Sequence, residues 1–320
     1  LGTLGSTGTS MGACASFLYN LRNGIEDIRT GRSRVAIIGG AEAPISPEVM
    51  EGYIAMGALA TDKKLRELDG QIGSAEAEHR RACRPFGENC GFTIAESAQV
   101  VILFDDALAM ELGATVFGAP AEVFVNADGY KKSIASPGVG NYLTMARALA
   151  ATRAILGERS VRERGLVQAH GTGTPQNRVT ESRIINETAR AFGIERWPVA
   201  AVKAYLGHSL GVASGDQISS TFGIWRDGII PGIATIDAPA HDVAHDRLAL
   251  CSSHTAVDPR DIDYAIINSK GFGGNNATAA VLAPAVVERM LSKRYSRSEY
   301  AAWQAANEQV RERQQDYDDA

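Results

Sequence analysis

The order of apolar runs and helical patterns predicts an α/β fold. In the second half of the chain, short apolar runs typical of strands alternate with segments of helical periodicity. This alternation is typical of a sheet covered by helices on both faces. Two of the predicted strands run into turns that contain glycine and histidine, and the chemistry of such sheets gathers at the carboxyl ends of strands. The fold class therefore also predicts where a functional site would lie.

The first half of the chain contains one clear helix and several strands. Apolar residues recur at helical spacing from Phe17 to Ile28, and Gly31 ends this helix. We expect a buried strand at residues 35–38, which Gly39 and Gly40 close, and further strands at 98–104 and 122–125. Residues 61–82 are charged and irregular, so we expect a surface excursion there.

The second half alternates more regularly. Helices are predicted at 141–156, 181–192 and 210–225, and strands at 166–169, 198–203, 248–251, 265–268 and 278–282. In the tail, Ser298 is expected to cap a helix whose stripe holds Tyr300, Trp303, Asn307 and Val310. Because the other faces of that helix are polar, we expect it to lie on the surface of its own domain.

Composition excludes several classes of protein. The 320 residues are 45% hydrophobic and 22% charged, which is ordinary for a globular chain. A net charge of −5 gives no electrostatic reason to expect nucleic acid or an anionic membrane as a partner. No apolar run approaches the ~20 residues that span a bilayer. Four cysteines are too few for a disulfide scaffold, so a cytoplasmic location is expected.

A cysteine, two histidines and a lysine stand where chemistry is expected. Cys14 follows a glycine-rich turn at the first turn of a helix, where the helix dipole favours a thiolate and unpaired N–H groups can hold an oxyanion. The alternative is a small buried core residue. His170 in AHGTGTP and His208 in KAYLGHSLG each follow a predicted strand, with Lys203 five residues before the second. A lone histidine is more often structural, but two in matching turns favour a site.

Six motifs occur in an order that resembles one family. They are GACASF, GRSRVAIIGGAEAPIS, RPFGENCGF, HGTGTP, KAYLGHSLG and NSKGFGG. Residues 1–285 resemble the β-ketoacyl-acyl-carrier-protein synthases of the elongating, Cys-His-His type. The resemblance implies a thiolase-like fold of two α/β halves in five layers, usually assembled as a homodimer.

The resemblance also implies roles for individual residues. Cys14 would be acylated, His170 and His208 would act on a malonyl thioester, and Lys203 would support the histidines. The backbone N–H groups of Cys14 and Phe272 would hold an oxyanion, with Phe272 and Gly273 in a gating loop. The implied substrate-binding residues are Thr172, Thr174, Lys270 and Gly271.

The implied reaction is acyl transfer to Cys14 followed by decarboxylative Claisen condensation with malonyl-acyl carrier protein in fatty-acid synthesis. The implied partners are acyl carrier protein and acyl and malonyl thioesters. No metal and no redox cofactor is expected, because the substrates carry phosphopantetheine. The alternatives are a polyketide-type ketosynthase, a synthase with a short acyl-CoA primer and a noncatalytic chain-length partner, which would lack the nucleophile.

The chain departs from the family pattern at three positions. Lys270 stands where phenylalanine is usual, Gln217 where glutamate is common, and Arg178 where aspartate is usual. Because Cys14, His170 and His208 are all present, these departures bear on which substrate the protein uses more than on whether it is active. We expect the Lys270 ammonium to reach solvent or a carboxylate such as Asp216, because burying it unpaired would be costly.

The resemblance divides the chain into three parts. Residues 1–113 are the remainder of the N-terminal half, with the excursion at 61–82, residues 114–285 are the C-terminal half, and 286–320 are a helical extension. The family's opening segment has no counterpart, so the first half is expected to be incomplete and a missing N-terminal segment of the same protein is an expected partner.

Two alternative interpretations, a zinc site and a degradative thiolase, have weaker support in the sequence. A zinc site could be drawn from His241, His245, Cys251 and His254, although a polar loop is the favoured interpretation. A degradative thiolase would need a second cysteine in residues 268–276, which contain none. Cys83 and Cys90 are expected to be ordinary thiols.

Overall fold

The computed structural model describes residues 5–71, 73, 76–129 and 138–319. Its main element is a six-stranded sheet with the order β3-β10-β9-β4-β5-β7. The antiparallel strands are β3 (Ala119–Ala127), β10 (Asn275–Leu282) and β9 (Tyr264–Gly271). The parallel part continues from β9 through β4 (Gly165–Gln168), β5 (Trp197–Ala200) and β7 (Leu248–Ala249). Strands β4 and β9 are buried along their whole length, as expected for a sheet covered on both faces.

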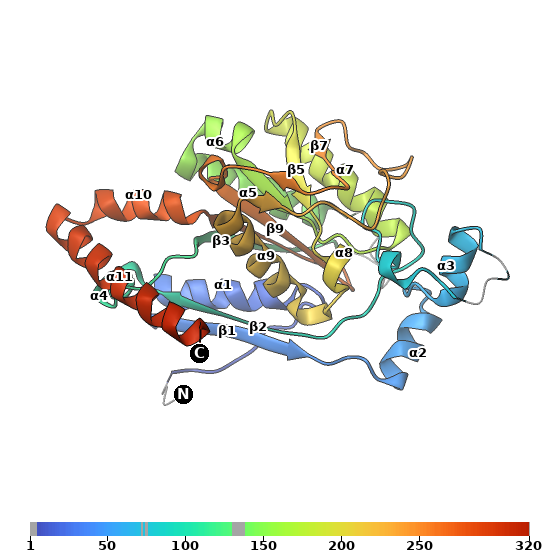
Figure 1. Cartoon of the computed structure of the whole chain (residues 1–320), viewed down its shortest axis with the longest axis horizontal. Helices are drawn as coiled ribbons and strands as arrows, with labels where there is room; N and C mark the ends of the chain where they lie inside the picture. The colour runs from blue at the N-terminus through green and yellow to red at the C-terminus, as the bar shows by residue number, and fades with distance from the viewer. Residues whose placement is uncertain (1–4, 72, 74–75, 130–137, 320) are drawn as a thin grey trace.

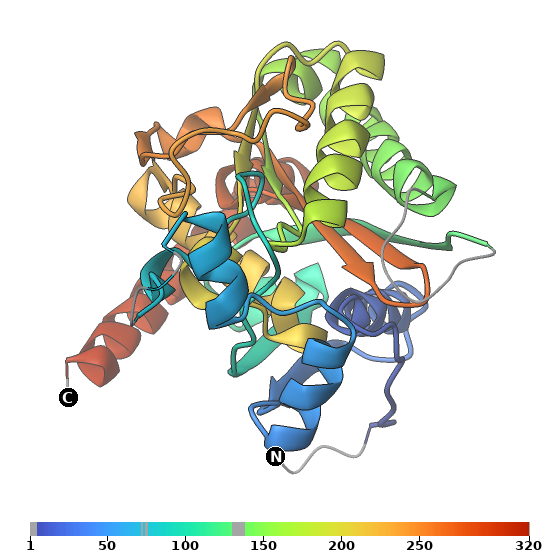
Figure 2. The ribbon, with the colours of Figure 1, turned by 90° about the vertical axis from the view of Figure 1, so that its right-hand side faces the viewer.

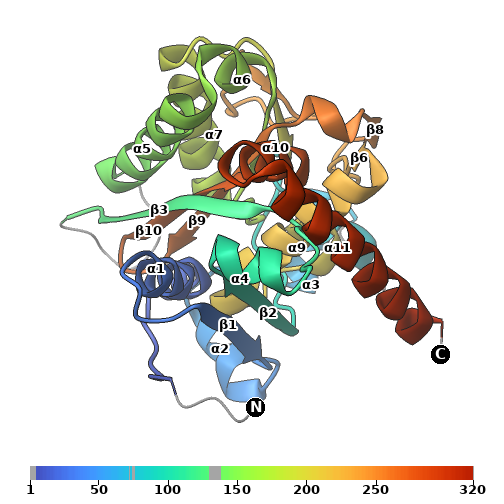
Figure 3. The ribbon, with the colours of Figure 1, turned by 90° about the vertical axis from the view of Figure 1, so that its left-hand side faces the viewer.

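Helices cover both faces of this sheet (Figure 3). On one face lie α5 (Val139–Leu156) and α7 (Pro175–Ala191), and on the other lie α1 (Ser16–Arg29) and α9 (Ala213–Asp227). The apolar stripe of α1, which includes Phe17, Leu18 and Leu21, is buried in the shared core. The predicted α/β architecture is therefore confirmed.

A second, two-stranded sheet lies beyond α1 and α9. It pairs β1 (Val35–Glu42) with β2 (Ser97–Phe104) in antiparallel register. Residues 35–38 were expected to form a buried strand, but of these only Ile38 is buried and the strand runs on to Glu42. The reason is that no layer of the described residues covers the outer face of this sheet. Among the described residues, the outer face of the β1-β2 sheet therefore stays uncovered.

Shorter elements connect these layers. They are α2 (Pro47–Ala55), α3 (Asp62–Leu68), a 3₁₀ turn at His79–Arg81, α4 (Asp106–Glu111), α6 (Glu158–Glu163), α8 (Lys203–Leu206), β6 (Ile229–Ile230), β8 (Thr255–Ala256) and a 3₁₀ turn at Pro259–Asp261. Helices α2 and α3 lie together at one end of the molecule (Figure 1, Figure 2). The excursion at 61–82 is therefore not wholly irregular, and its residues 72, 74 and 75 lie outside the described residues.

Several predicted boundaries were wrong. The strand expected at 198–203 ends at Ala200, and Lys203 begins α8 instead. The helix expected from residue 181 begins at Pro175, because the Thr174 side chain caps it and proline suits the first helical position. The helix expected at 210–225 starts with the 3₁₀ turn Leu210–Val212 before α9. The strands expected at 265–268 and 278–282 extend to Gly271 and begin at Asn275, so only residues 272–274 separate β9 from β10.

The tail forms α10 (Pro284–Arg294) and α11 (Arg297–Asp318). Ser296, not Ser298, caps α11, because its side chain and that of Glu299 form a reciprocal capping box. Trp303 and Asn307 are buried against the segment after α4: Trp303 donates to the Ala114 carbonyl at 3.2 Å. The helix lies on its own chain, as expected, while its end projects past the rest of the molecule (Figure 3).

Candidate active site

Cys14 lies in a tight turn immediately before α1. Ala13 has a left-handed backbone with φ of 50°, which a residue with a side chain seldom adopts unless its surroundings hold it. The Ser16 hydroxyl donates to the Ala13 carbonyl at 2.6 Å and accepts from the Gly12 N–H at 3.0 Å. Gly271 packs so closely that a Cβ there would meet the Gly12 carbonyl oxygen at 2.1 Å. The backbone around Cys14 is therefore held from two sides.

The Cys14 sulfur is buried, and it accepts hydrogen bonds from two backbone N–H groups, its own and that of Phe272. Burial raises the pKa of Cys14 to about 11, against the opposing effects of the Lys203 charge and these two N–H groups. The position at a helix N-terminus therefore does not by itself make Cys14 a thiolate at neutral pH, because the desolvation of a charged sulfur outweighs the attractions around it.

His170 stands in the turn that follows β4. The buried carboxylate of Glu181 on α7 holds this turn by accepting from the backbone N–H groups of His170 at 2.7 Å and Gly171 at 2.8 Å. The side-chain amides of Asn177 and Asn268 each donate a further hydrogen bond to Glu181 at 2.8 Å. Four donors thus compensate the buried carboxylate and position the histidine that follows the strand.

His208 stands in a second turn, after α8. Gly207 before it has φ of 77°, and a Cβ there would meet the Thr93 carbonyl oxygen at 2.9 Å. The His208 N–H donates to that same carbonyl at 2.7 Å. The ring of His208 packs edge-to-face on the rings of His170 and Phe92, with centroids 5.4 Å and 5.3 Å apart. The two histidines therefore meet directly, although they are far apart in the sequence.

Both imidazoles are neutral at physiological pH. Burial lowers the pKa of His170 and of His208 well below 6.5, and the Lys203 charge lowers both further. Lys203 is itself buried, and its Nζ donates to the His170 carbonyl oxygen at 2.6 Å. Burial also lowers the pKa of Lys203, against the opposing charge of Glu181. Neutral rings next to a cation can donate ring N–H groups to a developing negative charge.

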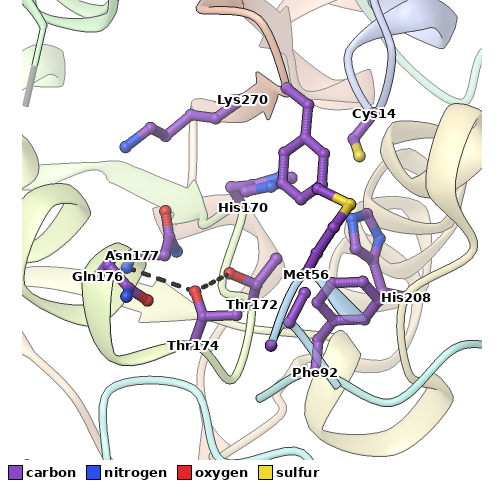
Figure 4. Close-up of a pocket in the computed structure, with 13 residues that line it drawn as sticks. Cys14, Met56, Phe92, His170, Thr172, Thr174, Gln176, Asn177, His208 and Lys270 are labelled. Carbon is purple, nitrogen blue, oxygen red and sulfur yellow. Dashed lines mark hydrogen bonds between the residues drawn. The ribbon is translucent and has the colours of Figure 1, made fainter. Parts of the chain in front are cut away.

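These residues line one pocket (Figure 4). Cys14, His170 and His208 lie at its centre. The apolar lining consists of Met56, Ala58, Phe92 and Phe272, and the polar lining of Thr172, Thr174, Gln176, Asn177 and Lys270. Met56, Gln176 and Asn177 were not predicted from the sequence. Gln176 and Asn177 directly follow the HGTGTP motif, which is the signal that could have found them.

Gly271 and Gly273, which were predicted to belong to the site, lie beside the pocket and are absent from its described lining. Gly271 packs against the turn that holds Cys14, as described above. Gly273 has φ of 83° in the β9-β10 turn, a conformation that glycine adopts without strain. Both glycines shape the backbone that presents Phe272.

The expectation that Lys270 would reach solvent or Asp216 is wrong. Lys270 is only 4% exposed, and its Nζ donates to the Thr180 hydroxyl at 3.1 Å. Asp216 instead accepts from the side chains of Ser97 at 2.7 Å and Gln99 at 2.8 Å. The reason is topological: Lys270 on β9 points to the α7 face of the sheet, whereas Asp216 belongs to α9 on the other face.

The other two departures have structural partners. Arg178 forms two hydrogen bonds with Asp242 at 2.9 Å and 3.0 Å and an ion pair with Glu88 at 2.9 Å. Gln217 donates its side-chain amide to three backbone carbonyls: those of Gln168 and Ala169 at the end of β4 and that of Asn268 within β9. Both residues therefore connect segments around the pocket.

The rival zinc site does not form. Within the described part of the chain, which includes all four candidates, no group of three metal-ligating side chains comes together. His241 contacts Glu88, and the Nδ1 atom of His254 accepts from the Gly232 N–H at 3.2 Å. All four cysteines are free.

Models of two domains of one family match this chain. The β-ketoacyl synthase N-terminal domain matches residues 1–109, and the β-ketoacyl synthase C-terminal domain matches residues 118–237. The chain belongs to the β-ketoacyl synthase family. The predicted family is thus confirmed, and so is the thiolase-like fold that it implies.

Curated members of the β-ketoacyl synthase family differ in how much of this chain they resemble. The β-ketoacyl-[acyl-carrier-protein] synthase FabY of Pseudomonas aeruginosa is 53% identical over 318 residues, which are 99% of this chain and 50% of that protein. The 3-oxoacyl-[acyl-carrier-protein] synthase 2 of Vibrio cholerae is 28% identical over 83% of this chain and 59% of its own length. The chain spans about half the length of the first of these synthases.

Solved structures agree with this assignment. The crystal structure of the ketosynthase FabY from P. aeruginosa superposes with a TM-score of 0.96 and covers 99% of this chain and 49% of its own. A type II polyketide ketosynthase in complex with its acyl-carrier protein superposes with a TM-score of 0.71 at 25% identity and covers 87% of this chain. No helix among the described residues has the length and apolar character to cross a membrane.

Proposed function

We propose that this protein is a β-ketoacyl-acyl-carrier-protein synthase that uses Cys14 as its nucleophile. The observation that supports this most directly is the meeting of Cys14, His170 and His208 in one pocket. A backbone N–H pair faces the sulfur, and a buried lysine lies behind both histidines. This arrangement suits acyl transfer followed by stabilisation of an enolate.

In the first step, the Cys14 sulfur attacks the carbonyl carbon of an acyl thioester. The new S–C bond replaces the bond to the thiol of the phosphopantetheine arm, and that thiol leaves with a proton. The raised pKa keeps the proton on the Cys14 sulfur at neutral pH, so the step needs a proton acceptor. A neutral imidazole in the same pocket can serve. The N–H groups of Cys14 and Phe272 would hold the tetrahedral oxyanion.

In the second step, a malonyl thioester loses CO₂. The electron pair of the broken C–C bond passes into an enolate, whose oxygen would accept hydrogen bonds from His170 and His208. The enolate carbon then attacks the acyl carbonyl on Cys14, and the cysteine sulfur leaves. Thr172 and Thr174, whose hydroxyls lie 3.2 Å apart on the pocket wall, would bind the thioester arm. All reacting groups in this scheme belong to the chain or to its substrates.

The proposal includes the rest of the assembly. An acyl carrier protein would deliver the thioesters, and the enzyme would act in the cytoplasm as a homodimer. Further chain of the same protein would cover the outer face of the β1-β2 sheet. That face exposes Val35 opposite Phe104 and Ile37 opposite Ile102, which is an apolar surface typical of a layer that packs against another.

The proposal is tested by intact-mass analysis of the full-length protein incubated with acyl donors of increasing length, on carrier protein or coenzyme A. We expect a mass gain of one acyl group in the wild-type protein and none in Cys14→Ala. Cys83→Ala is the matched control, because Cys83 is equally buried and does not line the pocket.

Cys14→Ala should also separate the two steps. We expect it to abolish ketoacyl product but to retain measurable CO₂ release from malonyl thioester, whereas His208→Ala should lower CO₂ release itself. Condensation by Cys14→Ala at the wild-type rate would show that another group is the nucleophile.

A further inference from the structure

Lys270 is buried in the wall of the pocket, and the two reaction steps described above give it no role. It is the last residue but one of β9 and stands two positions before Phe272, whose N–H faces the Cys14 sulfur. Placing an ammonium in such a buried position is costly unless hydrogen bonds or charges compensate it. A lysine in this environment is therefore a candidate for a specific task.

The segment from Ser269 to Phe272 is anchored on both faces of the sheet. Successive residues of a strand point to opposite faces. Ser269 points toward α1 and donates to the Cys14 carbonyl at 3.0 Å, whereas Lys270 points toward α7 and donates to the Thr180 hydroxyl at 3.1 Å. Gly271 follows these two anchors and precedes Phe272, and it lies in close contact with the backbone of Gly12.

Thr180 is a suitable acceptor for this lysine. Its hydroxyl donates its proton to the Gln176 carbonyl at 2.9 Å, so its oxygen lone pairs remain for the Lys270 Nζ. Thr180 also precedes Glu181, the carboxylate that holds the His170 turn. The hydrogen bond from Lys270 to Thr180 therefore connects the strand end that presents the Phe272 N–H with the helix that holds His170.

We propose that Lys270 is a positioning residue that acts through Phe272. Its ammonium ties the end of β9 to Thr180 on α7 and thereby holds the Phe272 N–H against the Cys14 sulfur. The Phe272 N–H, which is the oxyanion donor, and the turn that contains His170 are then fixed in position relative to each other. This inference deepens the function proposed above and rests on it for the role of the Phe272 N–H in acyl transfer.

The test uses side chains of similar shape in the full-length protein. Lys270→Met and Thr180→Val each remove one partner of the hydrogen bond, whereas Thr180→Ser keeps the hydroxyl. We expect Lys270→Met and Thr180→Val to slow acylation of Cys14 by at least about fivefold, the worth of one hydrogen bond, and at most about a hundredfold, the worth of an oxyanion donor. Thr180→Ser should stay within about twofold of the wild-type rate.

Two readouts separate positioning from a general structural role. Malonyl decarboxylation should change less than acylation in Thr180→Val, because decarboxylation does not use the Phe272 N–H. Thr180→Val is the variant for this comparison, because Lys270→Met also removes a charge that acts on His170. Adding Thr180→Val to Lys270→Met should cause little further loss, because the shared hydrogen bond is already absent. Thermal melts check that each variant is folded. If Lys270→Met fails to fold, the Thr180→Val and Thr180→Ser pair still decides the question.

A reaction that does not depend on condensation gives an independent measure. Loss of the Phe272 N–H should raise the pKa of the Cys14 thiol further, so alkylation by iodoacetamide should slow and its pH profile should move to higher pH in Lys270→Met and Thr180→Val. The other groups that act on Cys14 are Lys203, Glu42 and its own N–H, and these variants leave them in place.

The outcomes are distinct. Wild-type acylation and alkylation in Thr180→Val, or an equal loss in Thr180→Ser, would overturn the positioning role of Lys270. If instead the wild-type protein is alkylated at Cys14 but accepts no acyl group, the proposed synthase function fails, whereas the effect of these variants on alkylation can still be measured.

Discussion

At the residue scale, the site is a set of buried charges and polar groups that compensate one another. Glu181 accepts four hydrogen bonds, and Lys203 donates to the carbonyl of His170, whose ring pKa is lowered first by burial and then by the Lys203 charge. Cys14 retains its proton because burial outweighs the attraction of Lys203. Burial thus determines the protonation state of each reacting group.

The buried histidines should make stability depend on pH. In the unfolded chain a histidine binds a proton near pH 6.5, whereas burial lowers the folded pKa of His170 and His208 well below that value. The unfolded state therefore gains protons first as the pH falls. Stability is full well above pH 6.5 and is lost as the pH falls through that value, by about 1 kcal/mol per histidine between about pH 7.5 and pH 5.5. Urea unfolding in the full-length protein at several pH values measures this loss.

A matched pair of variants identifies the source of this pH dependence. His208→Asn should remove about half of the loss. The control is His245→Asn, because His245 is exposed and should leave the loss unchanged. An unchanged pH dependence in His208→Asn would show that His208 becomes protonated in the folded protein at an ordinary pH.

At the scale of elements, α11 packs against the segment that joins the two sheets and holds it in place. Trp303 packs with Met110 of α4 and Leu291 of α10 in one apolar cluster. Asn307 donates to the Gly113 carbonyl at 2.9 Å, and a Cβ at Gly113 would meet the Ala306 Cβ at 2.6 Å. The C-terminal extension is therefore built into the fold where β2 and α4 lead into β3.

Removing the anchor of α11 should destabilise the protein. We expect Trp303→Ala to lower the free energy of unfolding by about 3 kcal/mol or more, because it leaves a cavity beside Met110 and Leu291 and an unpaired Ala114 carbonyl. Denaturant unfolding of the full-length protein measures the change. The neighbouring Gln304→Ala, at an exposed position of the same helix, should change it by less than about 0.5 kcal/mol. Equal effects would show that the helix is not anchored through Trp303.

At the scale of the whole molecule, the two sheets differ in how they are covered. Helices lie on both faces of the six-stranded sheet, whereas α1 and α9 cover one face of the β1-β2 sheet. The other face exposes Val35, Ile37, Val100, Ile102 and Phe104. A surface of this kind favours association with another layer.

Residues 1–320 expressed alone should therefore self-associate. We expect light scattering to show oligomers and the dye ANS to bind, whereas a protein that also carries the further chain proposed above should show neither. Ile37→Thr together with Ile102→Thr, a directly opposed pair on the outer face, should reduce both signals in residues 1–320 because it keeps β-branched side chains but adds polarity. A monodisperse fragment that binds no dye would contradict the proposal that further chain covers this face.

Much of this molecule follows from local patterns in the sequence. Periodicity predicted α1, α5 and the strands β2, β4, β9 and β10, because each has a regular apolar face or a continuous buried run. The six motifs predicted the family and the fold, which the comparisons confirmed. The site residues Cys14, His170 and His208 were predicted from turns and motifs that are local in the chain, and their catalytic roles remain predictions.

The tertiary structure decided what depends on neighbours that are distant in the sequence. Burial from all sides raised the pKa of Cys14, although its helix position alone favours the thiolate. The direction of β9 sent Lys270 to Thr180 and away from Asp216, because alternate residues of a strand face opposite layers. The exposure of one face of β1 likewise depends on which layers pack against it, whereas the apolar run by itself predicted a buried strand. Local periodicity and turn-forming residues can be recognised in consecutive residues of the sequence. Burial, protonation state and hydrogen-bond partners are set only when the layers pack together.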